Sequence, residues 1–207
     1  MSTTPAPPNH DSPMPSPCLR AKDGHVLATP AQRWFEPVSP AEHRLLARVD
    51  GPVLDIGCGP ARHALALAQA GIVTLGIDIS LPALAVARRR GAPVLQRSIF
   101  ERVPGHGRWG TALLLDGNIG IGGAPSVLLR RVASSLHDTG RVLAEIGPPG
   151  TQPTRETVRL EHDGHLGPWF AWADIGVEHL EHLARDARMR VREVWTDSDR
   201  WFVQLDK

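Results

Sequence analysis

The chain has few of the residues that hold disulfide-bonded or zinc-binding proteins together. Its 207 residues include only two cysteines, Cys18 and Cys58, which lie far apart in the sequence. Such a pair indicates neither a disulfide framework nor a zinc site. The sequence also lacks the apolar segment of a signal peptide and any apolar run of about 18 residues, the length of a membrane span. We therefore expect a cytoplasmic protein that does not act at a membrane.

A strong charge of one sign is missing as well. The chain carries 23 Lys and Arg against 22 Asp and Glu, and its formal net charge is +1. A balanced surface attracts neither nucleic acid nor an anionic membrane over a distance. The basic run Arg88-Arg89-Arg90 is explained by its place before Gly91, at the end of an expected helix, where cations are favourable. We expect no nucleic-acid partner, and the sequence specifies no oligomeric state.

Proline is abundant at the N-terminus, where six of the first 17 residues are proline. A proline-rich segment with little to bury predicts disorder. We therefore expect a disordered tail over residues 1–30. The remaining residues, 31–207, are enough for one domain with a sizeable core.

The most informative stretch is residues 53–63, with the sequence Val-Leu-Asp-Ile-Gly-Cys-Gly-Pro-Ala-Arg-His. Its apolar start predicts a buried strand, its two glycines a turn, and the alanine- and leucine-rich residues 64–70 a helix. Such a turn brings backbone N–H groups close to a bound nucleotide. Glycine permits this approach because it has no Cβ atom.

Two nucleotide chemistries use a turn of this kind. Dinucleotide binding requires G-x-G-x-x-G, but Arg62 stands in place of the third glycine and Pro60 removes one donor. An NAD-dependent oxidoreductase is therefore the less favoured alternative. Asp78 ends the next expected strand, about 20 residues after the turn, where a carboxylate can accept hydrogen bonds from both ribose hydroxyls. Ser80 is the better cap for the following helix, so Asp78 is available for that role.

The rest of the chain alternates strands and helices, which predicts an α/β domain with a parallel sheet. The further expected strands are 93–96, 111–115, 141–146, 189–195 and 201–205, and the further expected helices are 41–49, 81–90, 126–136 and 177–187. A period-2 pattern around Asp163-Gly164 predicts an inserted hairpin near 155–173. Asp116 and Asn118 follow an apolar strand, at the sheet edge where doubly wound folds bind ligands. An ordinary turn is the alternative for these two residues.

The run Asp55-Ile56-Gly57-Cys58-Gly59-Pro60, together with Asp78, resembles the class I S-adenosylmethionine-dependent methyltransferase family, of the bacterial small-molecule type. Two positions depart from the family pattern, because Ala61 stands where a third glycine is usual and Ser98 where many members have aspartate. The resemblance covers residues 30–207. It implies a Rossmann-like fold, with a seven-stranded mostly parallel sheet, an antiparallel last strand and helices on both faces.

The resemblance also implies S-adenosylmethionine as the cofactor and methyl transfer to a small-molecule acceptor. The implied cofactor-binding residues are Asp55, Gly57, Gly59, Asp78, Ile79, Ser98, Ile99, Asp116 and Asn118. The hairpin residues Trp169, Phe170, Trp172 and His162 are candidates for the acceptor pocket, although core packing explains the aromatic cluster equally well. Asp116, then His162 and His165, are the candidate general bases. No metal is expected, since Asp116 and Asn118 do not form a carboxylate cluster. A non-catalytic S-adenosylmethionine-binding or scaffold protein is the second alternative.

Overall fold

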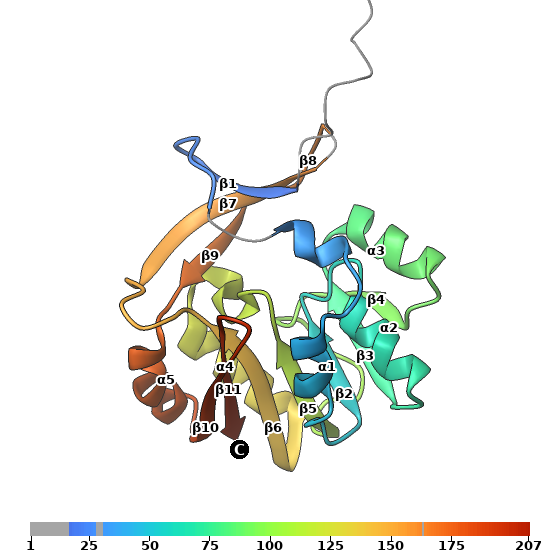
Figure 1. Ribbon diagram of the computed structural model, residues 1–207, viewed down its shortest axis with the longest axis vertical. Helices are drawn as coiled ribbons and strands as arrows, with labels where there is room; N and C mark the ends of the chain where they lie inside the picture. Colours follow the sequence, from blue (N-terminus) through green and yellow to red (C-terminus); the bar gives the residue numbers. More distant parts are fainter. Residues whose placement is uncertain (1–16, 28–30, 163) are drawn as a thin grey trace, which may run out of the picture.

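A seven-stranded sheet forms the centre of the computed structural model, which describes residues 17–27, 31–162 and 164–207 (Figure 1). Its strand order is β10-β11-β6-β5-β2-β3-β4. The strands are β2 Val53–Ile56, β3 Thr74–Asp78, β4 Val94–Gln96, β5 Trp109–Leu114, β6 Leu136–Ile146, β10 Arg190–Asp197 and β11 Arg200–Asp206. Neighbours from β4 to β6 are parallel, and β11 pairs antiparallel with both β6 and β10. The predicted mostly parallel sheet with an antiparallel last strand is confirmed.

Helices cover both faces of this sheet (Figure 1). They are α1 Pro40–Leu46, α2 Arg62–Gln69, α3 Leu81–Arg89, α4 Pro125–Ser135 and α5 Leu180–Asp186, with short 3-10 helices η1 Ala31–Phe35, η2 Asn118–Gly123 and η3 Val177–His179. Neighbouring residues of one strand point to opposite faces. Leu114 accordingly packs in the cluster under α4 and α5, whereas Leu113 packs in the cluster under α1 and α2. Burial on both faces explains why β5 is apolar throughout.

Local signals place the starts of two helices as predicted. Ser39 and Glu42 form a capping box at α1, where the Glu42 backbone N–H donates to Ser39 Oγ and the Ser39 N–H donates to Glu42 Oε2. Ser80 caps α3 through its Oγ. The last predicted helix, 177–187, is divided into η3 and α5.

A second, smaller sheet consists of β1 Cys18–Ala21, β7 Thr154–His162, β8 His165–Leu166 and β9 Phe170–Asp174. The strands β7 and β8 flank the predicted turn and pair antiparallel, and β9 pairs with the earlier part of β7. The returning half of the hairpin predicted near 155–173 is therefore divided into β8 and β9. Strand β9 packs on η2, so this sheet lies over the carboxyl end of β5 (Figure 1).

The prediction of a disordered tail over 1–30 is wrong for the segment that forms β1. Cys18–Ala21 pairs antiparallel with β7, from Cys18 opposite Glu161 to Ala21 opposite Val158. Leu19 is 1% exposed and packs in one cluster with Trp172. The composition of the tail did not reveal this, because the surface that buries β1 comes from a segment about 140 residues later. Residues 1–16 and 28–30 of the predicted tail lie outside the described residues.

Candidate functional site

The glycine turn between β2 and α2 has the backbone conformation that its glycines permit. Gly57 and Gly59 have φ values of +69° and +53°. A Cβ atom on Gly57 would lie 2.8 Å from the Nδ2 atom of Asn118, whereas one on Gly59 would meet no atom within 4 Å. Gly57 is therefore required by close packing, and the turn keeps an open surface at Gly59. Ala61 takes the left-handed conformation with φ +63°, which is usual for glycine.

Asn118 supports this turn from η2. Its Nδ2 donates to the backbone oxygens of Ile56 and Gly57, each at 2.9 Å. The sequence placed Asn118 at the sheet edge as a possible ligand contact. The structure brings it against the glycine turn, where it fixes the carbonyl groups that end β2.

Asp55 is a buried carboxylate with one oxygen unused. Asp55 is 1% exposed, and its Oδ2 atom has no hydrogen-bond partner among the described residues. Burial raises the pKa of Asp55, although the positive groups of His63 and Arg62 and a hydrogen bond from the Ala64 backbone oppose this effect. A buried acceptor without a donor is unfavourable. This oxygen is therefore a natural site for a positively charged donor group of a ligand.

Asp78, at the end of β3, connects the glycine turn to the start of α3. Its Oδ2 accepts from the Gly59 N–H and its Oδ1 from the Ser80 N–H, both at 2.8 Å. Burial raises the pKa of the carboxyl, and these hydrogen bonds oppose the rise. Each oxygen keeps further acceptor capacity, because an ionised carboxylate offers about four lone-pair positions. The next residue, Ile79, leaves 49% of its surface exposed.

The segment after β4 contains the residues predicted to meet an adenine ring. Ile99 is buried in the main core, whereas Ser98 is half-buried and its Oγ accepts from the Phe100 N–H at 3.2 Å. Phe100 is 45% exposed, and its ring lies where a Cβ atom on Gly122 would be 2.7 Å away. Sequence reasoning missed this exposed ring, for which the only signal is an aromatic residue directly after Ser98-Ile99.

Five buried or nearly buried charged residues form one ion-pair network at the carboxyl edge of the sheet, which we call the edge network. Its members are Glu42 of α1, Arg62 of α2, Asp116 after β5, Glu145 of β6 and Arg200 of β11. Arg62 Nη2 lies 2.6 Å from Glu42 Oε1 and 2.8 Å from Asp116 Oδ1. Arg200 Nη1 lies 3.0 Å from the same Glu42 oxygen, and Arg200 Nη2 lies 2.7 Å from Glu145 Oε2. No local pattern in the sequence indicates this network, because its members come from five separate segments.

Charges in the edge network stabilise one another. Burial raises the pKa of Glu42, but hydrogen bonds from His63 and Arg62 outweigh burial and hold that pKa well below its usual range. Burial lowers the pKa of Arg200, but Glu145 and Glu42 outweigh burial and raise it. Asp116, the first candidate for a general base, lies 2.8 Å from Arg62 and 3.4 Å from Arg200. Both guanidinium groups contact the same carboxylate oxygen, Asp116 Oδ1.

Trp172 is the hairpin side chain that reaches the sheet edge. It is 4% exposed, and a Cβ atom on Gly117 would lie 3.3 Å from its Cζ2 atom. Phe170 contacts it edge-to-face, with ring centroids 6.1 Å apart. Trp172 also belongs to the core cluster that buries Leu19, so it packs the second sheet and faces the loop after β5.

The other hairpin candidates lie elsewhere. His162 stacks on Phe35 of η1, with ring centroids 4.7 Å apart and an interplanar angle of 13°. Its cross-strand partner His165 is exposed. Trp169 is 42% exposed, and the guanidinium of Arg159 lies 4.8 Å from its ring centroid. Trp172 therefore lies at the sheet edge, whereas Trp169 lies at the surface beside Arg159.

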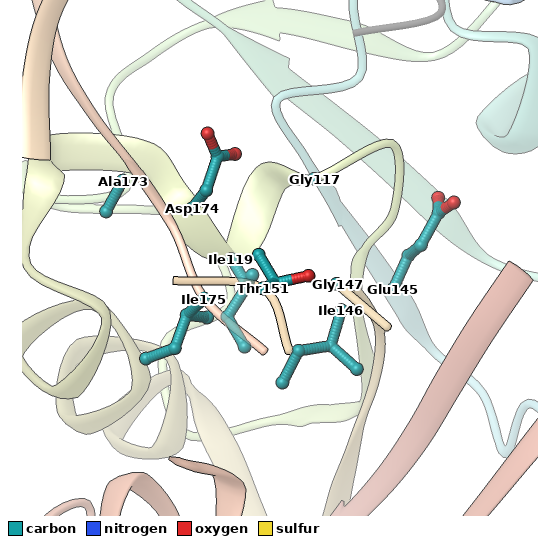
Figure 2. A pocket seen from close by; sticks show the side chains of 9 residues that line it. All are labelled: Gly117, Ile119, Glu145, Ile146, Gly147, Thr151, Ala173, Asp174 and Ile175. Atoms are coloured by element: carbon teal, nitrogen blue, oxygen red, sulfur yellow. The ribbon is translucent and has the colours of Figure 1, made fainter. Parts of the chain in front are cut away.

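A cavity of about 50 Å³ opens where the loop after β5, the end of β6 and β9 meet (Figure 2). It is lined by Gly117, Ile119, Glu145, Ile146, Gly147, Thr151, Ala173, Asp174 and Ile175. Figure 2 shows the carboxylates of Asp174 and Glu145 on opposite sides, with Gly117 between them. One water molecule needs about 10–15 Å³ of such volume, so the space accommodates a group of a few heavy atoms.

Within residues 17–27, 31–162 and 164–207, no three His, Cys, Asp or Glu side chains are arranged to hold a metal ion. Over the same residues, the helices are too short and too polar for any of them to cross a membrane.

Comparison with known proteins identifies the fold. Residues 53–104 match the family described as methyltransferase domain. A methyltransferase from Bacteroides fragilis, crystallised with S-adenosyl-L-homocysteine, is 22% identical at a TM-score of 0.76, covering 95% of this chain and 89% of that one. The 1,6-didemethyltoxoflavin-N1-methyltransferase of Burkholderia thailandensis is 20% identical at a TM-score of 0.61, covering 82% and 77%. The CcbJ methyltransferase of Streptomyces caelestis is 16% identical at a TM-score of 0.62, covering 82% and 89%.

Proposed function

We propose that this chain, which its fold and its matched domain assign to the class I S-adenosylmethionine-dependent methyltransferases, transfers a methyl group from S-adenosylmethionine to a small molecule. The observation that carries the proposal is the unused Oδ2 of buried Asp55 beside the open glycine turn. S-adenosylmethionine carries an ammonium group, a ribose and an adenine, and when bound it supplies an electrophilic methyl group. The residues at the turn fit the first two of these groups.

Each part of the cofactor has a matching residue. Asp55 offers its unused oxygen to the ammonium group, and Asp78 offers its remaining lone pairs to the ribose hydroxyls. The open surface at Gly59 lets the cofactor approach the backbone. Ser98 and the backbone N–H of Ile99 face the adenine in this arrangement, and Asn118 holds the turn in place. The structures from Bacteroides fragilis and Burkholderia thailandensis hold S-adenosylhomocysteine, which agrees with this assignment.

The acceptor belongs on the other side of the transferred methyl group, between the loop after β5 and β9. The cavity of about 50 Å³ lies there, and Trp172 covers the neighbouring Gly117. A small recess at the sheet edge suits a small molecule better than a macromolecule. The Burkholderia thailandensis enzyme was crystallised with 1,6-didemethyltoxoflavin, which is a small molecule. The chain's main contribution to the reaction is to orient the acceptor for attack on the methyl group.

Calorimetry with S-adenosylhomocysteine tests the cofactor assignment. Loss of two hydrogen bonds to a charged acceptor reduces affinity by at least about tenfold, so we expect that loss in Asp78→Ala. Asp186→Ala, which removes an aspartate of α5, should leave the affinity unchanged. Unchanged affinity in Asp78→Ala would refute the ribose assignment. Tight NAD binding without S-adenosylhomocysteine binding would favour the oxidoreductase alternative instead.

Transfer of labelled methyl groups tests catalysis separately from binding. The wild-type protein, labelled S-adenosylmethionine and a metabolite extract should yield a labelled product. Cofactor binding without any labelled product would favour the non-catalytic alternative, because a fold and a cofactor site do not prove turnover.

A further inference from the structure

Strand β9 lies unusually close to the loop after β5. A Cβ atom on Gly120 would lie 2.0 Å from the backbone oxygen of Ala173. Only glycine allows this contact, which brings the last residue of β9, Asp174, to the wall of the cavity (Figure 2). The sequence did not mark Asp174 as a candidate, because nothing local connects residue 174 with the loop.

Asp174 differs from the other carboxylates at this edge in the donors that it meets. Asp116 and Glu145 are paired with guanidinium groups of the edge network. Asp174 accepts from Trp172 Nε1 and from Thr154 Oγ1, each at 3.4 Å. Both donors are neutral, both distances are at the outer limit of a hydrogen bond, and no ion pair joins Asp174 to a cation in the described part of the chain. Its negative charge is therefore uncompensated.

The cavity wall contains two carboxylates, Glu145 and Asp174, and its lining includes no Lys, Arg or His. Glu145 is paired with Arg200 at 2.7 Å, and Arg33 Nη1 lies 3.9 Å from its other carboxylate oxygen. The wall of the cavity thus presents one excess negative charge, which favours a positively charged ligand group and repels an anion.

We propose that the acceptor is a small basic amine and that Asp174 binds its nitrogen. The proposal rests on the methyl-transfer function proposed above. The amine loses one proton to water, and its lone pair then forms the nitrogen–carbon bond as the carbon–sulfur bond breaks. The sulfur keeps the electron pair of the broken bond, so the positive charge passes from sulfur to nitrogen. A carboxylate beside the nitrogen stabilises the charge where it develops.

Ion-exchange fractions of a small-molecule cell extract provide the test. The extract is divided at pH 7 into cationic, neutral and anionic fractions, and each is incubated with the protein and methyl-labelled S-adenosylmethionine. We expect labelled product from the cationic fraction. Asp174→Asn keeps the shape of the side chain and removes its charge, so it should reduce the rate of transfer at least about tenfold. Affinity for S-adenosylhomocysteine should stay within about twofold, because Asp174 is not assigned to the cofactor.

Two further variants separate a specific role from a general loss of structure. Glu181→Gln removes the charge of an exposed glutamate on α5 and should transfer at the wild-type rate. Asp174→Glu restores the charge and should recover part of the activity lost in Asp174→Asn. Label that enters only the neutral or anionic fraction, or a wild-type rate in Asp174→Asn, overturns the amine assignment while the methyl-transfer function stands. Absence of label from every fraction overturns that function and the assignment with it.

Discussion

Replacing Arg200 with methionine tests whether the edge network holds the site together. Arg200 is 9% exposed, and its guanidinium contacts the carboxylates of Glu42, Asp116 and Glu145. Arg200→Met keeps an unbranched stem and removes the guanidinium with its charge. Glu42 and Asp116 then share Arg62, and Glu145 retains only the more distant Arg33 Nη1 at 3.9 Å, so negative charge at the edge is left poorly compensated.

Breaking a buried ion pair by removing one partner typically costs about 3–5 kcal/mol. For a chain of this size, each kcal/mol corresponds to roughly 2–4 °C, so the unfolding temperature should fall by about 6–20 °C at pH 7. Acidification should narrow the difference. The pKa of Glu42 is lowered in the folded wild type, so its contribution is present above its ordinary pKa of 4.5 and is lost as the pH falls. In the variant, Glu42 has lost one of its guanidinium partners, so less of this pH-dependent contribution remains to be lost.

Thermal unfolding followed by circular dichroism at pH 7 and at about pH 4 measures both effects. Arg44→Met is the matched control, because Arg44 pairs with Asp197 at the surface and its side chain is 61% exposed. Its unfolding temperature should stay close to that of the wild type. The reasoning fails if Arg200→Met and Arg44→Met lose the same stability, or if the deficit of Arg200→Met is as large at the acidic pH. Arg200→Lys, which keeps the charge without the forked geometry, should lose less than the methionine variant.

Three further substitutions probe the backbone around the site. Asn118→Ala removes the donor to two carbonyl groups of the glycine turn and should cost about 1–3 kcal/mol in urea unfolding, with weaker S-adenosylhomocysteine binding; full affinity would exclude a supporting role. Ala61→Gly removes the strain of an alanine in the left-handed conformation, which favours folding. It also removes a buried methyl group and gives the unfolded chain more conformational entropy, and both effects disfavour folding. The free energy of unfolding, measured in the same assay, should therefore change by less than about 1 kcal/mol. Gly120→Ala forces a methyl group onto a carbonyl of β9, and we expect a loss of about 3 kcal/mol or more; wild-type stability would show that β9 moves freely.

Local patterns account for the part of the site that was predicted. The turn at Gly57 and Gly59 and the carboxylate of Asp78 each follow a short apolar strand, and the structure places Asp78 against the Gly59 N–H. The helix starts at Ser39 and Ser80 depend on neighbours within three residues. Such signals predict the structure correctly because the atoms that they bring together are already close along the chain.

Other features were inaccessible to the same reasoning. The local sequence around Glu42 indicates only a capping box with Ser39, although the second carboxylate oxygen of Glu42 meets Arg200 across 158 positions of sequence. Arg62 stands out in the sequence only as a departure from the dinucleotide pattern. The proline-rich composition of the N-terminal segment predicts a tail over residues 1–30, yet residues 18–21 form β1 because β7 offers a pairing edge.

The sequence by itself determined the α/β alternation, the glycine turn, the carboxylate at the end of β3 and the family that these residues resemble, because each depends on periodicity or on neighbours a few residues apart. Only the tertiary structure decided which carboxylates at the sheet edge are neutralised. Asp116 is paired with two arginines, whereas Asp174 meets neutral donors alone. Whether a carboxylate at the sheet edge is neutralised depends on partners from distant segments of the chain. The close packing of β9 on Gly120 places Asp174 at this edge.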